Sequence, residues 1–171
     1  MEISPLIPNR KHKLYKLRLP NNNWVNLTYY QIKNWNKPYK DAYFSIGCYM
    51  KIKEYSKLYE SVRVDEKLKD KYYMFQDIYV LDYDNESKLN ILKGDKVMKS
   101  LGFKRRYILQ TSPNNFQWCY SGKKVYFPEV RDYVKELVNT LKDKGVSFDE
   151  GTMLNIHNIF RIPYGERMIK K

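Results

Sequence analysis

The hydrophobic positions of the chain follow two periods, and the shorter one predicts strands. In seven stretches, apolar and aromatic residues either alternate with polar ones or run together between turn residues. Aromatic and β-branched residues in such patterns are typical of strands. The predicted strands are K-L-Y-K-L-R-L (13–19), W-V-N-L-T-Y (24–29), D-A-Y-F-S-I-G (41–47), residues 77–83, R-R-Y-I-L-Q-T-S (105–112), F-Q-W-C-Y (116–120) and I-F-R-I-P (159–163).

The longer period predicts helices and is clearest in residues 128–144. Apolar residues recur there three and four positions apart, Pro128 suits a first helical turn, and Gly145 ends the pattern. Other helices are predicted around 30–37, within 50–71 and around 94–101. The mixture indicates an α/β (α+β) fold with a mixed, largely antiparallel sheet and flanking helices. The 171 residues hold no internal repeat or obvious linker, so we expect a single domain.

The predicted strand 77–83 runs into two aspartates, in the sequence D-I-Y-V-L-D-Y-D. Residues two apart on a strand share a face, so Asp82 and Asp84 should point the same way as Ile78 and Val80. Two carboxylates placed in this manner repel each other unless a cation lies between them. Carboxylate oxygens suit Mg²⁺ or Mn²⁺, which makes the pair a candidate metal site. The alternative is a strand end that passes into solvent at the D-N-E-S turn.

Two later segments carry further side chains that suit phosphates or cations. In R-R-Y-I-L-Q-T-S-P-N-N-F-Q-W-C-Y, Ser112 precedes a turn and Gln117 projects from the returning strand; the alternative is an ordinary hairpin. In the second segment Asp149 follows a short apolar stretch, and Arg161 lies in an apolar strand. An arginine in such a strand needs an anionic partner, which is either a phosphate or, in the alternative, one of the aspartates.

The charge of the chain narrows the range of partners. Thirty-two Lys and Arg against 19 Asp and Glu give a formal net charge of +13. Such an excess favours a polyanion, with nucleic acid first and an acidic membrane second. Seventeen tyrosines add to the case for nucleic acid, because aromatic rings stack on bases. A merely soluble basic protein from an AT-rich genome would show the same composition.

Neither zinc nor a membrane is indicated by the sequence. Cys48 and Cys119 lie far apart, and His12 and His157 show no ligand spacing, so no structural zinc is predicted, while a single disulfide stays open. No apolar run approaches the roughly 18 residues of a membrane span, and the N-terminus lacks the apolar core of a signal peptide. We therefore expect a soluble, cytoplasmic protein without a membrane partner.

Taken in order, the three polar segments resemble the archaeo-eukaryotic primase (AEP) superfamily, which includes small primase subunits and the primase–polymerases of plasmids and viruses. V-L-D-Y-D is similar to its first motif, a hydrophobic strand that ends in D-x-D. T-S-P-N-N-F-Q-W is similar to its second, a serine-containing turn followed by a histidine on the next strand. S-F-D-E-G-T-M-L-N-I-H-N-I-F-R-I-P-Y-G-E-R is similar to its third, an acid followed by a basic residue before a proline and then a histidine. The resemblance spans residues 41–168 and implies an RRM-like catalytic core preceded by an N-terminal αβ unit.

This resemblance implies roles for individual residues. The catalytic carboxylates, which would also hold Mg²⁺ or Mn²⁺, are Asp82, Asp84 and Asp149. The nucleotide-binding positions are Ser112, Gln117, Arg161 and Arg167. Basic residues that could follow the backbone of a template, or else form a solvated strand end, are Lys104, Arg105, Arg106, Lys123 and Lys124. Two aromatic residues either belong to the core or stack on bases, and these are Trp118 and Tyr120.

Several departures from the family pattern bear on these roles. Gln117 stands in the histidine position of the second motif, and Arg167 in that of the final histidine; both can still donate hydrogen bonds to phosphate. Asn114 and Asn115 replace the usual glycine, and asparagine tolerates left-handed turns. Neither the zinc module nor the helicase segment of some family members is recognisable. Residues 1–171 are therefore expected to form a minimal primase–polymerase-like catalytic domain.

The resemblance implies a template-dependent nucleotidyltransferase, a DNA primase or primase–polymerase that adds nucleotides on single-stranded DNA by two-metal chemistry. Its partners would be a single-stranded DNA template and nucleoside triphosphates, with an accessory primase subunit or a helicase as a further candidate. A virus or plasmid is the expected source. Two other functions stay open: a non-catalytic protein of replication that binds single-stranded nucleic acid, and a metal-dependent nuclease. The nuclease ranks last, because no lysine or histidine base is evident close to Asp82 and Asp84.

Overall fold

A computed structural model of the protein describes residues 1–60 and 65–163. These residues divide into two units. Met1–Phe75 and His157–Ile162 form the first unit, and Gln76–Ile156 with Pro163 form the second. Each unit combines strands with helices, and the predicted α/β (α+β) class with largely antiparallel sheets and flanking helices is confirmed. Among the described residues, no helix is long and apolar enough to cross a membrane.

The first unit is built on a four-stranded sheet of order β2-β1-β3-β8, in which all neighbouring strands are antiparallel. Strand alternation buries Tyr15 and Leu17 on one face of β1 and leaves Lys16 and Arg18 half-buried on the other. The elements of this unit are a 3₁₀ turn (Arg10–His12), β1 (Tyr15–Arg18), β2 (Trp24–Leu27), α1 (Tyr29–Lys33), β3 (Asp41–Ser45), β4 (Gly47–Tyr49), α2 (Ile52–Glu60), α3 (Glu66–Tyr72) and β8 (Ile159–Arg161).

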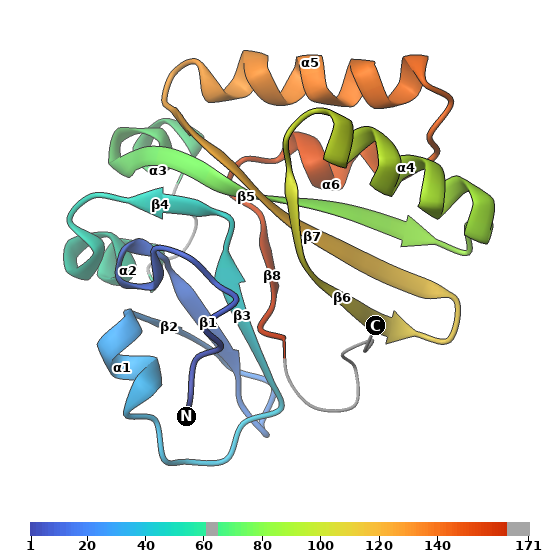
Figure 1. Cartoon of the computed structure of the whole chain (residues 1–171). Coiled ribbons are helices and arrows are strands. Elements are labelled where there is room, and N and C mark those ends of the chain that lie inside the picture. The colour runs from blue at the N-terminus through green and yellow to red at the C-terminus, as the bar shows by residue number, and fades with distance from the viewer. Residues whose placement is uncertain (61–64, 164–171) are drawn as a thin grey trace. The chain divides into compact units, whose positions relative to one another are not determined.

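The second sheet has the order β4-β5-β7-β6, and β5 (Tyr73–Asp84), β6 (Lys104–Ser112) and β7 (Asn115–Tyr126) carry the second unit. The chain passes from β5 through α4 (Lys88–Ser100) into β6, and β7 returns between β5 and β6 (Figure 1). α4 and α5 (Val130–Asp143) cover one face of this sheet (Figure 1). The ring of Tyr79 lies 5.9 Å from that of Tyr133 on α5, and the Tyr83 hydroxyl lies against Gly94 of α4. The opposite face carries the side chains of Asp82 and Asp84, because they alternate with Tyr79 and Tyr83 along β5.

Several elements extend beyond the predicted bounds. β5 begins at Tyr73 instead of residue 77, because Tyr73 and Phe75 are also buried. α4 begins at Lys88 instead of residue 94, with the Ser87 hydroxyl accepting a hydrogen bond from the Asn90 amide as an N-cap. Conversely, α1 ends at Lys33 and is shorter than the predicted 30–37. The short helix α6 (Glu150–Leu154) was not predicted at all.

Candidate functional site

The end of β5 is tied to the hairpin that joins β6 and β7. Asp82 is partly buried and Asp84 is exposed. Directly after them Asn85 adopts a left-handed conformation, with φ 53°, and turns the chain. Its amide donates hydrogen bonds to the carbonyl of Asn114, at 2.9 Å, and to Oδ1 of Asn115, at 3.1 Å. The two aspartates and the serine-containing turn, which are separate motifs in the sequence, therefore lie at one edge of the second unit.

Asp149 reaches the same edge from a distant part of the sequence. Its main-chain amide donates a hydrogen bond to the carbonyl of Asp82, at 3.0 Å. The segment before it is held by Ser147, whose amide and carbonyl both bond the side chain of Asn90, each at 2.7 Å. The Ser147 hydroxyl also donates to Glu86, at 2.9 Å. Sequence reasoning missed these positioning residues, because Asn90 and Glu86 belong to a turn and a helix start that showed no apolar pattern.

The carboxylates of the site interact electrostatically. The pKa of Asp82 is raised to about 6, first by burial and then by the negative charges of Asp84 and Asp149. A hydrogen bond from Gln117, on β7, opposes this shift. Four of the predicted site residues are thus brought together at the end of β5, while their part in catalysis stays a prediction.

The donor chemistry of the site suits a divalent cation. Three carboxylates supply the hard oxygen ligands that Mg²⁺ and Mn²⁺ prefer. The raised pKa of Asp82 reflects first the burial of its carboxylate and then the negative charges of Asp84 and Asp149, which a bound cation would offset. As the side chains lie, no three His, Cys, Asp or Glu residues within 1–60 and 65–163 are gathered closely enough to hold a metal ion. Asp149 also uses Oδ1 to cap α6, accepting from the Thr152 amide at 3.0 Å, so a bound cation would share this carboxylate with the helix.

Of the other predicted nucleotide-binding residues, Ser112 belongs to the hairpin at this edge of the second unit, whereas Arg161 belongs to the first unit. Ser112 ends β6 opposite Asn115, beside a register shift in the hairpin. Arg161 belongs to the first unit, where it forms an ion pair with Asp41 at 2.8 Å and lies over the ring of Tyr43. Arg161 is therefore paired with an aspartate, but this is Asp41 on the neighbouring strand and none of the site candidates. Arg167 lies outside the described residues.

The basic residues predicted to follow a template lie at the other end of the β6–β7 hairpin. Lys104 is paired with Ser121, whereas Gln117 is paired with Leu109, five residues further along β6. At about 3.3 Å per residue this separates Lys104 from Gln117 by roughly 16 Å. Arg106 donates to the Ser121 hydroxyl at 2.8 Å, and Lys123 lies over the Tyr133 ring. The structure does not gather these side chains around the carboxylates.

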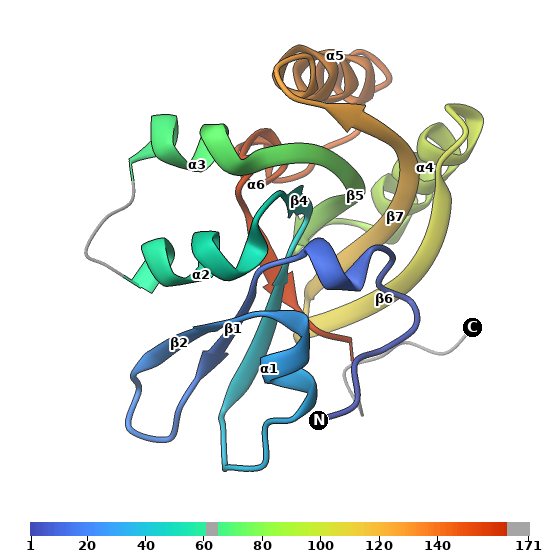
Figure 2. The same cartoon turned by 90° about the vertical axis from the view of Figure 1, so that its left-hand side faces the viewer.

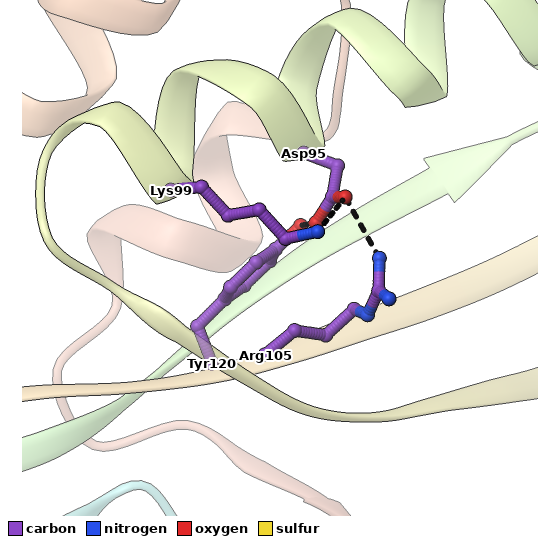
Figure 3. A network of polar contacts seen from close by, with 4 residues as sticks. All are labelled: Asp95, Lys99, Arg105 and Tyr120. Carbon is purple, nitrogen blue, oxygen red and sulfur yellow. Dashed lines mark hydrogen bonds and ion pairs between the residues drawn. The ribbon is translucent and has the colours of Figure 1, made fainter.

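Arg105 has a structural partner instead. Its guanidinium forms an ion pair with Asp95 of α4 at 2.7 Å, and both side chains are 9% exposed. Lys99 lies 3.1 Å from the same carboxylate, and the Tyr120 hydroxyl donates to it at 2.8 Å (Figure 3). Tyr120 is buried in this network, and Trp118 is also buried, so both are core aromatics and not stacking platforms.

Comparison with known proteins bears on the fold. No protein-family model matches the sequence, and no curated protein is significantly similar to it. Among solved structures, the AEP domain of the cyanophage S-2L primase-polymerase matches with a TM-score of 0.51, over 90% of this chain and 74% of that chain. The chain has the fold of an AEP domain. The two sequences are 13% identical, so the similarity concerns the AEP fold alone, which the three motifs had predicted.

Proposed function

We propose that the chain is a template-dependent nucleotidyltransferase of the primase–polymerase type, which adds nucleotides on single-stranded DNA. A fold alone does not define a reaction, so the proposal depends on the chemistry of the site. The observation that carries it is the interaction of Asp82 with Asp84 and Asp149 at the end of β5, within an AEP fold. In this proposal residues 1–171 form one catalytic domain that includes both units.

Asp82, Asp84 and Asp149 would hold one or two Mg²⁺ or Mn²⁺ ions, which supply charge stabilisation for the attacking 3′ oxygen and the leaving pyrophosphate. Gln117 donates a hydrogen bond to Asp82 and so holds this carboxylate in one orientation. The main-chain bond from Asp149 to Asp82 supports this proposal, because the Asp149 side chain would then turn from a fixed backbone towards the other two. The contribution of the protein is therefore positioning, which matters most for phosphoryl transfer.

The remaining predicted residues take roles in binding substrates. Ser112, at the end of the hairpin, would donate its hydroxyl to a phosphate oxygen, together with Gln117. Arg161 would exchange Asp41 for the triphosphate, and Arg167 would add a second guanidinium. Lys104, Arg106, Lys123 and Lys124 would contact a template strand where it leaves the site. Arg105 contributes least to this group, because its charge is already paired with Asp95.

The proposal is tested by extension of a primer on a single-stranded DNA template, with Mg²⁺ or Mn²⁺ and nucleoside triphosphates. The wild type should incorporate nucleotides that complement the template. Asp82→Asn and Asp84→Asn should each reduce incorporation by about 100-fold or more, because the cations lose a charged ligand. The matched control is Glu136→Gln, which removes an exposed carboxylate from α5 and should leave incorporation unchanged. Full incorporation by a combined Asp82→Asn, Asp84→Asn variant would refute the assignment.

A non-catalytic protein that binds single-stranded nucleic acid is the second candidate. The observation that favours it is the open arrangement of the carboxylates in the part of the chain described here, where no three are gathered around a metal position. Such a protein would bind oligonucleotides without any dependence on divalent ions and would incorporate nothing. Cleavage of labelled DNA in the absence of nucleotides would instead identify a nuclease.

A further inference from the structure

One face of the first unit's sheet carries aromatic and basic side chains in adjacent positions. The strand register puts Arg18 of β1 opposite Trp24 of β2, and Lys16 of β1 opposite Tyr43 of β3. These four side chains, called the Trp24 face below, alternate along their strands with the buried residues of the core. Trp24 is 46% exposed, which is unusual for so large an apolar side chain. Trp24 is thus exposed on a face of the sheet that α2 covers in part, where Asn26 is buried and Lys16 lies over Tyr59.

The Trp24 face is held together by contacts between rings and cations. The ring centroids of Trp24 and Tyr43 are 5.4 Å apart. Lys16 Nζ lies 5.2 Å from the Trp24 ring centroid, and the Arg18 guanidinium lies 5.8 Å from it. Neither cation forms an ion pair with a carboxylate among the residues that the structure describes. The carboxylate of Asp41, which lies opposite Arg18 in the β1–β3 ladder, is paired with Arg161, so Lys16 and Arg18 can both bind an external anion.

A second basic residue adds to the positive charge near Lys16. The pKa of Lys16 is lowered by burial and by the charge of Lys69 on α3. The two ammonium groups lie over the ring of Tyr59, at 5.1 Å and 4.9 Å from its centroid. Like charges gathered over an aromatic ring repel each other, and a bound anion relieves the repulsion.

A cavity of about 550 Å³ adjoins this surface where α2 lies next to β2 (Figure 2). Lys53 and Lys57 of α2 line it, together with Asn26 of β2. Asn26 lies directly opposite Lys16 in the β1–β2 ladder and on the same face as Trp24. Asn26 is only 6% exposed, and its Oδ1 accepts no hydrogen bond from the described residues. A buried acceptor without a partner is unfavourable, so this cavity is suited to a donor group from outside.

We propose that the Trp24 face and the adjoining cavity bind single-stranded nucleic acid. A base stacks on Trp24, whose exposed ring lies beside Tyr43 and offers a face that a paired and stacked duplex cannot reach. Phosphates lie against Lys16 and Arg18, and Lys53 with Lys57 continues the basic track into the cavity. There the amino group of a base can donate to Asn26. The surface belongs to the first unit, so binding requires neither a divalent cation nor the carboxylates of the second.

The test is a titration of labelled single-stranded oligonucleotides, one of DNA and one of RNA, in EDTA and without nucleotides. Trp24→Ala should weaken binding about tenfold, as expected for the loss of one base stack, whereas Trp24→Phe should retain most of the affinity. Tyr126→Ala, which truncates a 56% exposed aromatic residue of the second unit, should have no effect. A blunt-ended duplex should bind more weakly than either single-stranded oligonucleotide. The difference in affinity between the DNA and the RNA oligonucleotide shows which sugar is preferred.

The role of the cations is measured separately by the dependence on salt. For single strands, each phosphate contact contributes about 0.7 to the slope of log affinity against log salt, so Lys16→Gln should reduce the slope by about that amount. Lys135→Gln on α5 should leave it unchanged. Wild-type affinity in Trp24→Ala, or an unchanged slope in Lys16→Gln, would overturn the proposal. Loss of binding in Asp82→Asn under EDTA would also overturn it, whereas failure of catalysis alone would not.

Discussion

Replacing Asp82 by asparagine should stabilise the protein at neutral pH, although it removes a proposed catalytic residue. The pKa of Asp82 is raised from 3.8 to about 6, first by burial and then by Asp84 and Asp149. The folded protein therefore holds this proton more tightly than the unfolded chain, and the free energy of unfolding falls as the pH rises from about 4 to about 6. Asparagine has nearly the same shape and no charge, so the variant avoids this loss.

The size of the effect follows from the shift in pKa. A rise of about two pKa units corresponds to roughly 3 kcal/mol if the group is fully shielded. Asp82 is only partly buried, and water screens its charge, so we expect about 1–1.5 kcal/mol. The gain should be complete at about pH 8 and should shrink as the pH falls from about 6 to about 4. Below that range both side chains are neutral, and the difference should vanish.

The assay is urea denaturation at pH 8 and at pH 4, in EDTA, followed by circular dichroism. Glu136→Gln serves as the control for the loss of one exposed carboxylate. In separate samples without EDTA, saturating Mn²⁺ at pH 8 should raise the free energy of unfolding of the wild type but not that of Asp82→Asn. A cation that binds only the folded wild type adds to its stability. The reasoning fails if Asp82→Asn, compared with this control, is no more stable than the wild type at pH 8.

Two further predictions concern the packing of α4 on the second sheet. Asp95→Asn should lower the free energy of unfolding by about 3 kcal/mol in urea denaturation, because it leaves the buried guanidinium of Arg105 without its counter-charge; a loss below about 0.5 kcal/mol would contradict this account. Gly94→Ala should lower the melting temperature, because a Cβ at this position collides with the Tyr83 hydroxyl. Gly151→Ala on α6 is the control and should leave the melting temperature unchanged, because a Cβ there meets no atom closer than 3.6 Å. Equal melting temperatures for the two alanine variants would show that the collision is relieved without loss.

Local features of the site could be predicted from the sequence. The shared face of Asp82 and Asp84 follows from strand alternation alone, because the buried run before them defines the strand. The turn in S-P-N-N follows from residue preferences in hairpins, although neither Asn114 nor Asn115 adopts a left-handed conformation. The position of Asp149 depends on a main-chain bond to Asp82, which no local pattern encodes. Only the order of the three motifs, compared with a known family, suggested that it would join them.

Other features were missed because they depend on contacts between distant residues. The start of α4 carries Leu89 and Leu92 in exposed positions, so its apolar stripe is broken where the helix begins. Arg105 was grouped with its basic neighbours, and its pairing with Asp95 becomes apparent only when α4 lies on the sheet. Likewise, Lys16 and Trp24 meet because of the register between β1 and β2, which the intervening turn determines.

The proposed catalytic site is tested most directly by locating a bound cation. Crystals grown with Mn²⁺ and a non-hydrolysable nucleoside triphosphate would show the ion in an anomalous difference map. The account predicts a peak with carboxylate oxygens of Asp82 and Asp84 as ligands, at roughly 2.0–2.3 Å, and with Asp149 turned towards it. A peak bound elsewhere, or no peak at saturating Mn²⁺, would contradict the claim that these three carboxylates form a metal site.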